Sequence, residues 1–227
     1  MNHLYVNGDS YSAKENAQPN PYADFLAEKW NVPVVNQAWP GSNNDRICRA
    51  TVQYIESLDL SKQKPFVIIG WSFINRREVW YYGTKKQFEN RIPDKEMYLG
   101  EYNRLVTLDW LLPNDATYEQ KCLIIASAEE EKQVIDFYMQ VFFLADYLAA
   151  RQIDYLFFSG ADNTDLVQKI YPMSITERVH ANEKIYQLDK FCIRDYALAR
   201  DPQCNPVTGH LSIDGHRMFA NFLEEII

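Results

Sequence analysis

Two segments near opposite ends of the chain carry the residue types of nucleophilic catalysis. The first, GDSYS at residues 8–12, directly follows a short apolar run, a pattern that predicts a strand, a tight turn and an exposed Ser10 hydroxyl. Open α/β sheets form their ligand crevice at such carboxyl ends of strands. The second segment, HLSIDGH at residues 210–216, precedes a C-terminal helical pattern. A serine and a histidine this far apart in sequence can act as nucleophile and base once the fold brings them together.

The elements that must position these residues are short apolar runs that alternate with helical patterns. Each run is nearly continuous and bounded by turn residues, which is typical of parallel strands covered on both faces. The runs lie at residues 4–6, 32–35, 66–69 and 155–158. Apolar stripes with helical spacing lie at residues 47–58, 134–148 and 219–226, and Ser212 is placed to cap the last of them. The alternation predicts an α/β fold with a doubly wound parallel sheet and right-handed crossovers.

The composition is that of one globular domain. With 227 residues, of which 47% are hydrophobic, the chain can bury a sizeable core, so we expect a single domain over residues 1–227. No apolar stretch approaches the length of a membrane span, and the first residues lack the charged-then-apolar pattern of a signal peptide. The net charge is −8 and basic residues gather only in small doublets, which argues against a nucleic-acid surface.

The cysteines also bear on where the protein works. They lack C-x-x-C spacing, and without a secretory signal this favours free thiols over disulfides. The four are Cys48, Cys122, Cys192 and Cys204. We therefore expect a cytoplasmic or virion-associated protein with no membrane and no nucleic-acid partner.

Two stretches interrupt the alternation. Residues 76–120 are rich in aromatic and charged residues and are interpreted as an insertion. This insertion is either a surface subdomain that buries its own aromatic side chains or a cap that walls one side of a cleft. The apolar residues 122–126 fit a strand or the start of the following helix, and periodicity does not separate the two.

Four segments in this order resemble the sequence blocks of the SGNH (GDSL-type) hydrolase superfamily. They are GDS at residues 8–10, NQAWPGSNNDRI at 36–47, IIGWS at 68–72 and HLSIDGH at 210–216. The sequences of the two middle blocks are similar to those of SGNH-like proteins encoded by tailed phages. These proteins also have a nearby arginine-glutamate pair, which is Arg77-Glu78 here. The resemblance implies a flavodoxin-like fold, that is, a three-layer α/β/α sandwich around a parallel sheet.

The resemblance also implies a chemistry. Ser10 would attack an ester carbonyl, with His210 as general base and later general acid. The family stabilises the oxyanion with two backbone N–H groups, which correspond to Ser10 and Gly41, and with an asparagine side chain from the third block. It implies an acyl-Ser10 intermediate, no cofactor, and a small O-acyl ester as substrate, for example on a carbohydrate or other glycan. A thioester or a lipid acyl group is the alternative substrate.

The chain departs from the family at the third oxyanion donor. Where the family has Gly-x-Asn, residues 70–72 read Gly-Trp-Ser, so Ser72 stands in the place of the asparagine. A hydroxyl is shorter and less preorganised than an amide, and losing one oxyanion donor typically costs roughly 10²–10³ in turnover. Asn43, Asn44 and Asn75 are alternative donors.

The second departure concerns the acid of the triad. The family has an aspartate three residues before the histidine, but Val207 stands there. Asp201 and Asp214 are candidate acids by proximity in sequence, and Asp214 also suits the first turn of a helix. A Ser-His dyad without an acid is the alternative.

The remaining candidates are aromatic residues and a further histidine. Trp39 and Trp71 each lie within two residues of a proposed oxyanion position, so they either bind substrate or pack against the sheet. His216 stands where the family often has a structural histidine or aromatic residue, so it is expected to pack in the core or behind the site. The spacing of His210, Asp214 and His216 matches no zinc signature and predicts no metal site. The two departures motivate a rival interpretation from another class: a catalytically degenerate SGNH fold that serves as a carbohydrate-binding or virion structural module.

Overall fold

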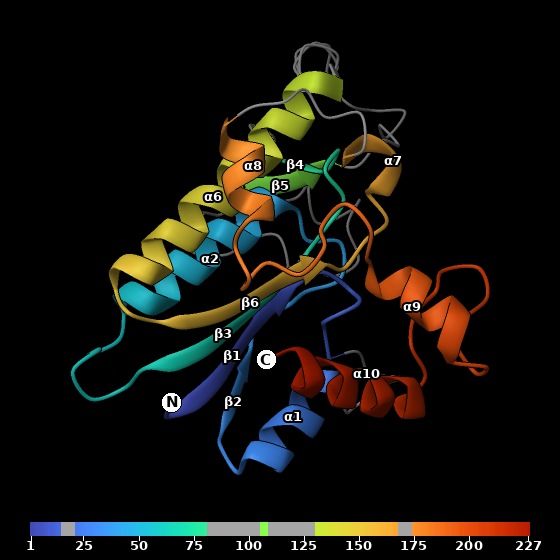
Figure 1. Ribbon diagram of the computed structural model, residues 1–227, viewed down its shortest axis with the longest axis horizontal. Coiled ribbons are helices and arrows are strands. Elements are labelled where there is room, and N and C mark those ends of the chain that lie inside the picture. The colour runs from blue at the N-terminus through green and yellow to red at the C-terminus, as the bar shows by residue number, and fades with distance from the viewer. Residues whose placement is uncertain (15–20, 81–104, 109–129, 168–173) are drawn as a thin grey trace, which may run out of the picture.

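A computed structural model describes residues 1–14, 21–80, 105–108, 130–167 and 174–227 of the chain (Figure 1). A four-stranded, all-parallel sheet lies at its centre, formed by β1 (His3–Gly8), β2 (Val34–Asn36), β3 (Pro65–Trp71) and β6 (Asp154–Ser159). The strand order is β2-β1-β3-β6, so the chain starts in an inner strand, adds β2 on one side of β1, and then adds β3 and β6 on the other side. The strands lie where the apolar runs predict them, and the predicted parallel sheet is confirmed.

Helices cover both faces of the sheet (Figure 1). On one face α1 (Tyr22–Trp30) packs against α10 (Ile213–Ile226), and on the other α2 (Asn44–Glu56) packs against α6 (Glu130–Ala150). The remaining described helices are short: α7 (Thr164–Val167), α8 (Ser174–His180) and α9 (Ile193–Arg200). The three-layer α/β/α arrangement is the predicted fold class.

Alternating side chains along the strands build a separate core on each face. In β1, Leu4 and Val6 pack with α1 and α10, whereas Tyr5 between them packs with α2 and α6. This division follows from the period of two residues along a strand, since successive side chains point to opposite faces. Because these residues are buried on both sides, the strands read as continuous apolar runs.

An irregular segment occupies a fifth strand position beside β6. Parallel bridges pair Phe157 with Ile185 and Ser159 with Cys192, although the segment between them is not a regular strand. The Phe157 N–H donates to the Lys184 carbonyl at 2.9 Å. The segment therefore covers an edge of the sheet that would otherwise offer unpaired backbone groups.

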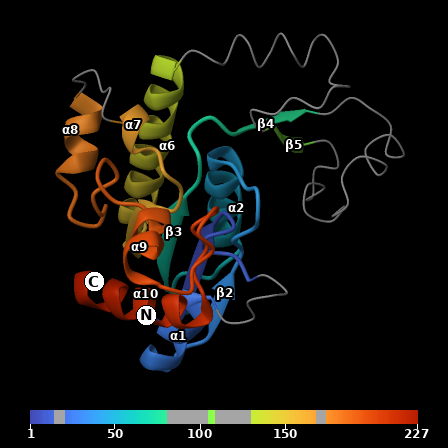
Figure 2. The same ribbon diagram turned by 90° about the vertical axis from the view of Figure 1, so that its right-hand side faces the viewer.

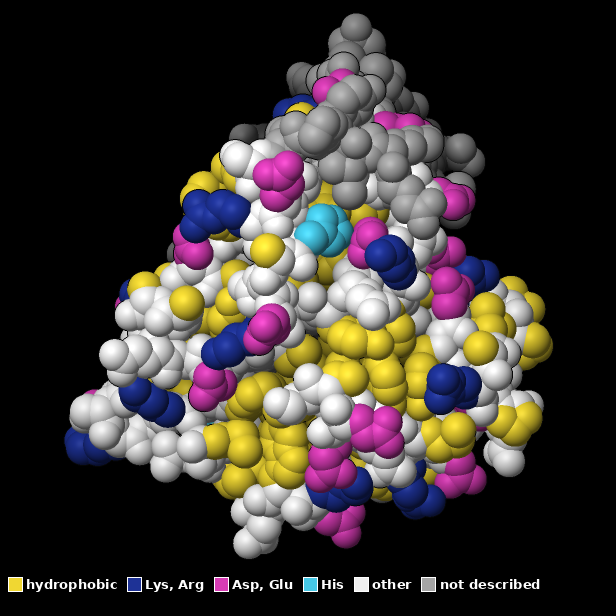
Figure 3. Space-filling model, viewed as in Figure 1, with side chains coloured by type: hydrophobic (Ala, Val, Ile, Leu, Met, Phe, Trp, Pro, Cys, Tyr) yellow, Lys and Arg dark blue, Asp and Glu magenta, His cyan; other side chains and the backbone are white. Residues whose placement is uncertain are grey.

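Aromatic side chains join this segment to the C-terminal helix. Tyr186 and Phe191 pack against Phe222 of α10, with ring centroids 5.6 and 5.4 Å apart. Figure 3 shows apolar side chains gathered on this face, with basic and acidic side chains intermixed around them. The aromatic contacts fix α10, and with it the loop that carries His210.

The predicted insertion is described only in part. Of residues 76–120 the structure describes Arg76 and two strands, β4 (Arg77–Trp80) and β5 (Leu105–Leu108), which pair antiparallel as a separate sheet next to α2 (Figure 2). The other aromatic residues of this range, residues 122–126 and Cys122 lie outside the described residues. Both the single domain over residues 1–227 and the cap stay predictions.

The described helices and thiols give two further findings. None of the described helices combines the length and the apolar character needed to cross a bilayer. Cys48, Cys192 and Cys204 are free thiols. In α10, the Ser212 hydroxyl accepts a hydrogen bond from the Gly215 N–H at 3.0 Å, so the predicted N-cap is confirmed.

Candidate active site

A tight turn after β1 holds Ser10 at the carboxyl edge of the sheet. The Ser12 N–H donates to the Asp9 carbonyl at 3.0 Å, and the Tyr11 N–H donates to the Asp9 carboxylate at 3.1 Å. Asp9, Tyr11 and Ser12 are all buried, whereas Ser10 is partly exposed. The buried neighbours of Ser10 therefore anchor the turn, and Ser10 itself stays accessible from the solvent.

The fold brings His210 to this hydroxyl. The His210 Nε2 atom lies 2.8 Å from the Ser10 Oγ atom, a hydrogen bond between residues 200 positions apart. Asn205 shapes the loop: its N–H donates to the His210 carbonyl at 3.0 Å, and its side-chain oxygen accepts from the Thr208 N–H at 3.1 Å. Gly209 has a φ of 69°, a conformation that favours glycine.

Two residues that the sequence analysis did not single out hold the other side of the imidazole. The His210 Nδ1 atom lies 2.7 Å from the Thr208 hydroxyl oxygen. The Tyr11 ring stacks on the imidazole with centroids 4.6 Å apart and an angle of 9° between planes. The Tyr11 hydroxyl donates to the Thr208 carbonyl at 2.7 Å. The only sequence signal for either residue is its position, one after Ser10 and two before His210.

The two candidate acids have other partners. The buried Asp201 carboxylate accepts from the Ser212 N–H at 2.7 Å and from the Ser212 hydroxyl at 2.9 Å, which anchors the start of α10. Asp214 lies in the first turn of that helix, as predicted, and pairs with Arg217 at 3.0 Å in an exposed contact. Because Thr208 occupies the one hydrogen-bonding direction of Nδ1, neither carboxylate holds that atom of His210.

This assignment predicts opposite results for the two acids. The Asp201→Asn variant is expected to lose about 1–3 kcal/mol of unfolding free energy. The two carboxylate oxygens accept from the N–H groups of Gln203 and Ser212, and an amide would turn its NH₂ group toward one of them. Asp214→Asn is expected to stay within about 0.5 kcal/mol, as for most exposed positions. Denaturant unfolding of both variants checks the prediction, and equal stabilities would contradict it.

The second block forms a turn beside Ser10. The Ser42 N–H donates to the Trp39 carbonyl at 3.0 Å, and Gly41 has a φ of 78°. Pro40 followed by a glycine with positive φ is the pattern of a type II turn. The Trp39 N–H donates to the Gly8 carbonyl at 3.0 Å, which ties the turn to the end of β1. The Gly41 backbone is thereby fixed next to the turn that carries Ser10.

Ser72, the predicted third oxyanion donor, lies inside the protein. Its hydroxyl is fully buried, 2.6 Å from the Ser42 carbonyl and 3.0 Å from the Asp9 carboxylate, so its single hydrogen is shared between these acceptors. Asn44, an alternative donor, accepts from the Ser72 N–H at 2.8 Å with its side-chain oxygen. The Asn75 side-chain oxygen is buried and has no hydrogen-bond partner among the residues that the structure describes. Ser72 and Asn44 thus connect the end of β3 with the turn at Ser42 and with the Asp9 turn.

An ion pair that the sequence analysis missed lies beneath these turns. The Arg76 Nη1 atom is 3.6 Å from the Asp9 carboxylate and 3.2 Å from the Ser72 hydroxyl, and its guanidinium lies over the Phe73 ring. The side chain of Asp9 is fully buried and that of Arg76 is 14% exposed. Burial raises the pKa of Asp9 from 3.8 to about 6, and the charge of Arg76 opposes this rise.

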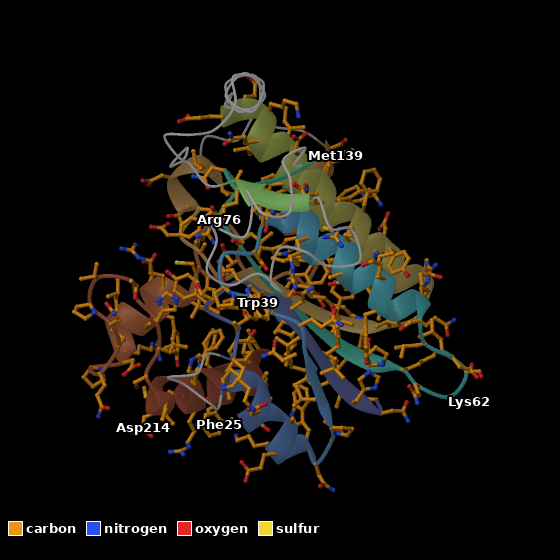
Figure 4. All side chains as sticks on the ribbon, turned by 180° about the vertical axis from the view of Figure 1, so that it is seen from behind. Phe25, Trp39, Lys62, Arg76, Met139 and Asp214 are labelled. Atoms are coloured by element: carbon orange, nitrogen blue, oxygen red, sulfur yellow. The ribbon has the colours of Figure 1, made fainter. Side chains whose placement is uncertain are left out.

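The two tryptophans differ in place. Trp71 is fully buried and packs edge-on against Phe137 and Phe157, with centroids 5.8 and 5.5 Å away. Its side chain is therefore part of the core on the α2 and α6 side of the sheet. Trp39 is partly exposed at the carboxyl edge, on the same side of the molecule as Arg76 (Figure 4). A role of Trp39 in substrate binding stays a prediction.

A buried network connects the Ser10 turn to the C-terminal helix. The Tyr22 hydroxyl donates to the Ser12 hydroxyl at 2.9 Å, and the Tyr22 N–H donates to Nδ1 of His216 at 3.3 Å. His216 is 3% exposed, and burial lowers its pKa to about 4. It is therefore a neutral core residue at pH 7, as predicted.

One group of described residues has the donor types of a metal site. Ligand atoms of Asp162, Cys192 and Asp195 lie within 4.8 Å of one another. Their atoms already take part in local contacts: Cys192 Sγ caps α9, and the Asp162 carboxylate accepts from Thr164 and pairs with Arg194. Asp162 and Cys192 thus have partners within the protein.

Solved structures that resemble this chain include a lipolytic protein and two esterases. Over the full length of both chains, the protein resembles a lipolytic protein of the G-D-S-L family from Desulfitobacterium hafniense DCB-2, with 9% identity and a TM-score of 0.52. The acetyl xylan esterase AlAXEase matches 99% of this chain and 100% of its own, with 12% identity and a TM-score of 0.46. A mutant of Axe2, an acetyl-xylooligosaccharide esterase from Geobacillus Stearmophilus, matches 99% of this chain and 94% of its own, with 12% identity and a TM-score of 0.44.

The chain thus shares its fold with a protein of the G-D-S-L family, while membership of the SGNH superfamily and the likeness to phage-encoded proteins stay predictions. No curated protein matches the sequence. A family model matches residues 7–220, which is most of the chain, and its description is a family of unknown function. The chain therefore belongs to the family DUF6071.

Proposed function

We propose that this protein is a serine hydrolase of the SGNH type that cleaves a small O-acyl ester through an acyl-Ser10 intermediate. The observation that carries the proposal is the 2.8 Å contact between Ser10 Oγ and His210 Nε2. This distance is within the reach that a general base needs to take the proton of a nucleophile. A partly exposed serine with a histidine at this distance is the arrangement of an activated nucleophile.

The reaction proceeds in two halves. His210 Nε2 takes the Ser10 proton while Oγ attacks the ester carbonyl, and the resulting imidazolium gives that proton to the leaving alkoxide. An acyl-serine and an alcohol are formed. Water then attacks the acyl-serine with the same base, so that the carboxylic acid leaves and Ser10 regains its proton.

Two backbone donors are proposed for the developing oxyanion. The N–H groups of Ser10 and Gly41 have no acceptor among the described residues, and the turns that carry them are fixed to β1. Donors held in place before the reaction stabilise the oxyanion without reorganisation. Ser72 contributes indirectly, because its hydroxyl joins the Asp9 turn to the Ser42 carbonyl.

The substrate class is proposed from the surroundings of Ser10. Trp39, a partly exposed residue, begins the turn that carries Gly41, and its aromatic ring is proposed as a flat apolar surface for a sugar ring. An O-acyl group on a carbohydrate therefore fits the site, and the chemistry needs no cofactor.

Covalent labelling with a fluorophosphonate tests the proposal. We expect a single adduct on the wild type by intact mass, none on Ser10→Ala, and an unchanged adduct on the control Ser61→Ala. Ser61 is exposed and precedes β3, at the amino edge of the sheet, whereas Ser10 follows β1 at the carboxyl edge. Lys62, its neighbour, is labelled in Figure 4. No adduct on folded wild-type protein would overturn the proposal and favour a carbohydrate-binding module, which a glycan array would then test.

A further inference from the structure

We infer that Thr208 is the positioning residue of the base, in the place that a carboxylate occupies in a Ser-His-Asp triad. The inference rests on the proposed function, because it assigns a partner to His210 in that reaction. Its starting point is the 2.7 Å contact between the Thr208 hydroxyl and His210 Nδ1. A ring nitrogen has a single hydrogen-bonding direction in the plane of the ring, so this contact fills the site of a triad acid.

The contact sets the tautomer that catalysis needs. Nε2 must carry a lone pair to take the Ser10 proton, so Nδ1 must carry the hydrogen of the neutral ring. In that tautomer Nδ1 donates to the Thr208 oxygen, toward which the His210 N–H also points, at 3.4 Å. Unlike a carboxylate, however, a hydroxyl can also donate, so Thr208 favours this tautomer without enforcing it.

Tyr11 complements Thr208 by fixing the plane of the ring. Its ring lies nearly parallel to the imidazole, and its hydroxyl holds the Thr208 carbonyl at 2.7 Å. Tyr11 is 5% exposed and follows Ser10 directly. The turn that holds Ser10 therefore also positions the His210 ring, through stacking, and the Thr208 backbone, through the Tyr11 hydroxyl. The orientation that a buried carboxylate provides elsewhere comes here from a stacked ring and a neutral hydroxyl.

Thr208 stabilises the charged form of His210 less than a carboxylate would. A carboxylate beside Nδ1 would stabilise the imidazolium that forms during the reaction, whereas a hydroxyl offers only its dipole. Thr208 is exposed, so water reaches this side of the ring. Removing the hydroxyl is therefore expected to cost about tenfold in rate, far less than the loss of a triad aspartate, which costs about 10⁴.

Four variants at two adjacent positions test the inference through the rate of fluorophosphonate labelling. Thr208→Val keeps the branched shape and removes the hydroxyl, and we expect labelling about tenfold slower. Thr208→Ser keeps the hydroxyl and is expected to stay within about threefold of the wild type. Thr208→Asp is expected to raise the pH midpoint of labelling by about one unit, because a carboxylate favours the charged imidazole. Val207→Ala is the control, since Val207 is 80% exposed in the same loop.

A spectroscopic measurement separates positioning from folding. The ¹⁵N shifts of His210 are expected to show the Nδ1–H tautomer in the wild type and in Thr208→Ser, and a mixture of both in Thr208→Val. If the wild type is labelled and Thr208→Val matches it in rate and tautomer, the inference is overturned while the proposed function stands. If the folded wild type takes no adduct, both are overturned.

Discussion

Replacing both Ser10 and His210 by alanine is expected to slow ester hydrolysis no further than replacing Ser10 alone. The two side chains lie 2.8 Å apart and act in one proton transfer, so removing either one disables the other. Each single variant is expected to lose at least about 10³ in kcat/KM, and the losses should not multiply, as for residues that act as a unit. The measurement is hydrolysis of p-nitrophenyl acetate by the four proteins at one pH.

Two controls accompany the hydrolysis measurement: thermal unfolding of the four proteins and the activity of Ser61→Ala. Ser10 and His210 are only partly buried, so thermal unfolding of all four proteins is expected to be similar. The Ser61→Ala variant should retain the wild-type rate. If the double variant were slower than Ser10→Ala by the full factor seen for His210→Ala, the two residues would act independently, and His210 would not be the base of Ser10.

Replacing Arg76 by methionine is expected to destabilise the protein more at pH 8 than at pH 5. The Asp9 carboxylate is fully buried, and Arg76 is the cation beside it at 3.6 Å. Removing one partner of a buried pair leaves an uncompensated charge, which typically costs about 3–5 kcal/mol. Methionine keeps an apolar stem of similar length over Phe73, so the change isolates the charge. We expect a loss of about 3 kcal/mol at pH 8 and about 1 kcal/mol at pH 5.

The sign of the pH dependence follows from the direction of the Asp9 shift. Its pKa in the folded protein is about 6, above the ordinary 3.8, so the unfolded chain ionises first as the pH rises. The contribution of Asp9 to stability is therefore full below about pH 4 and is lost as the pH passes 6, a change of about 3 kcal/mol at about 1.4 kcal/mol per pKa unit. At pH 5 the carboxyl is largely protonated, so it needs no cation.

Urea unfolding at both pH values measures this effect. Arg217→Met is the matched control, because Arg217 pairs with Asp214 at the surface, where the salt bridge is worth little at either pH. A loss from Arg76→Met that was the same at pH 5 and pH 8 would show that Asp9 does not depend on Arg76 for its charge.

The strands and the nucleophile turn are the parts that sequence patterns predict well. Continuous apolar runs have few alternatives to buried parallel strands, and the carboxyl ends of parallel strands must share one edge. The place of Trp71 was also predictable in principle. Val67, Ile69 and Trp71 alternate along β3, so a period of two residues puts all three in the core between the sheet and α2 and α6.

Hydrogen-bond partners were not predictable in the same way. The direction of the Ser72 hydroxyl depends on the Ser42 carbonyl, which comes from another strand connection 30 residues earlier. Asp201 is a carboxylate close to His210 in sequence, as a triad acid would be. Its side chain instead accepts a hydrogen bond from the N–H of Ser212, the N-cap residue of α10. A sequence shows which residues can bond, and only the packed chain shows which of them meet.

The span of 200 residues between Ser10 and His210 has a consequence for timing. Contacts between distant residues form late in folding, because closing a long loop costs chain entropy that the contact alone does not repay. The loop that carries His210 leads into α10, which packs on α1, the last described helix against the first. We therefore expect Ser10 to become reactive toward a fluorophosphonate only late in folding, once α10 has docked.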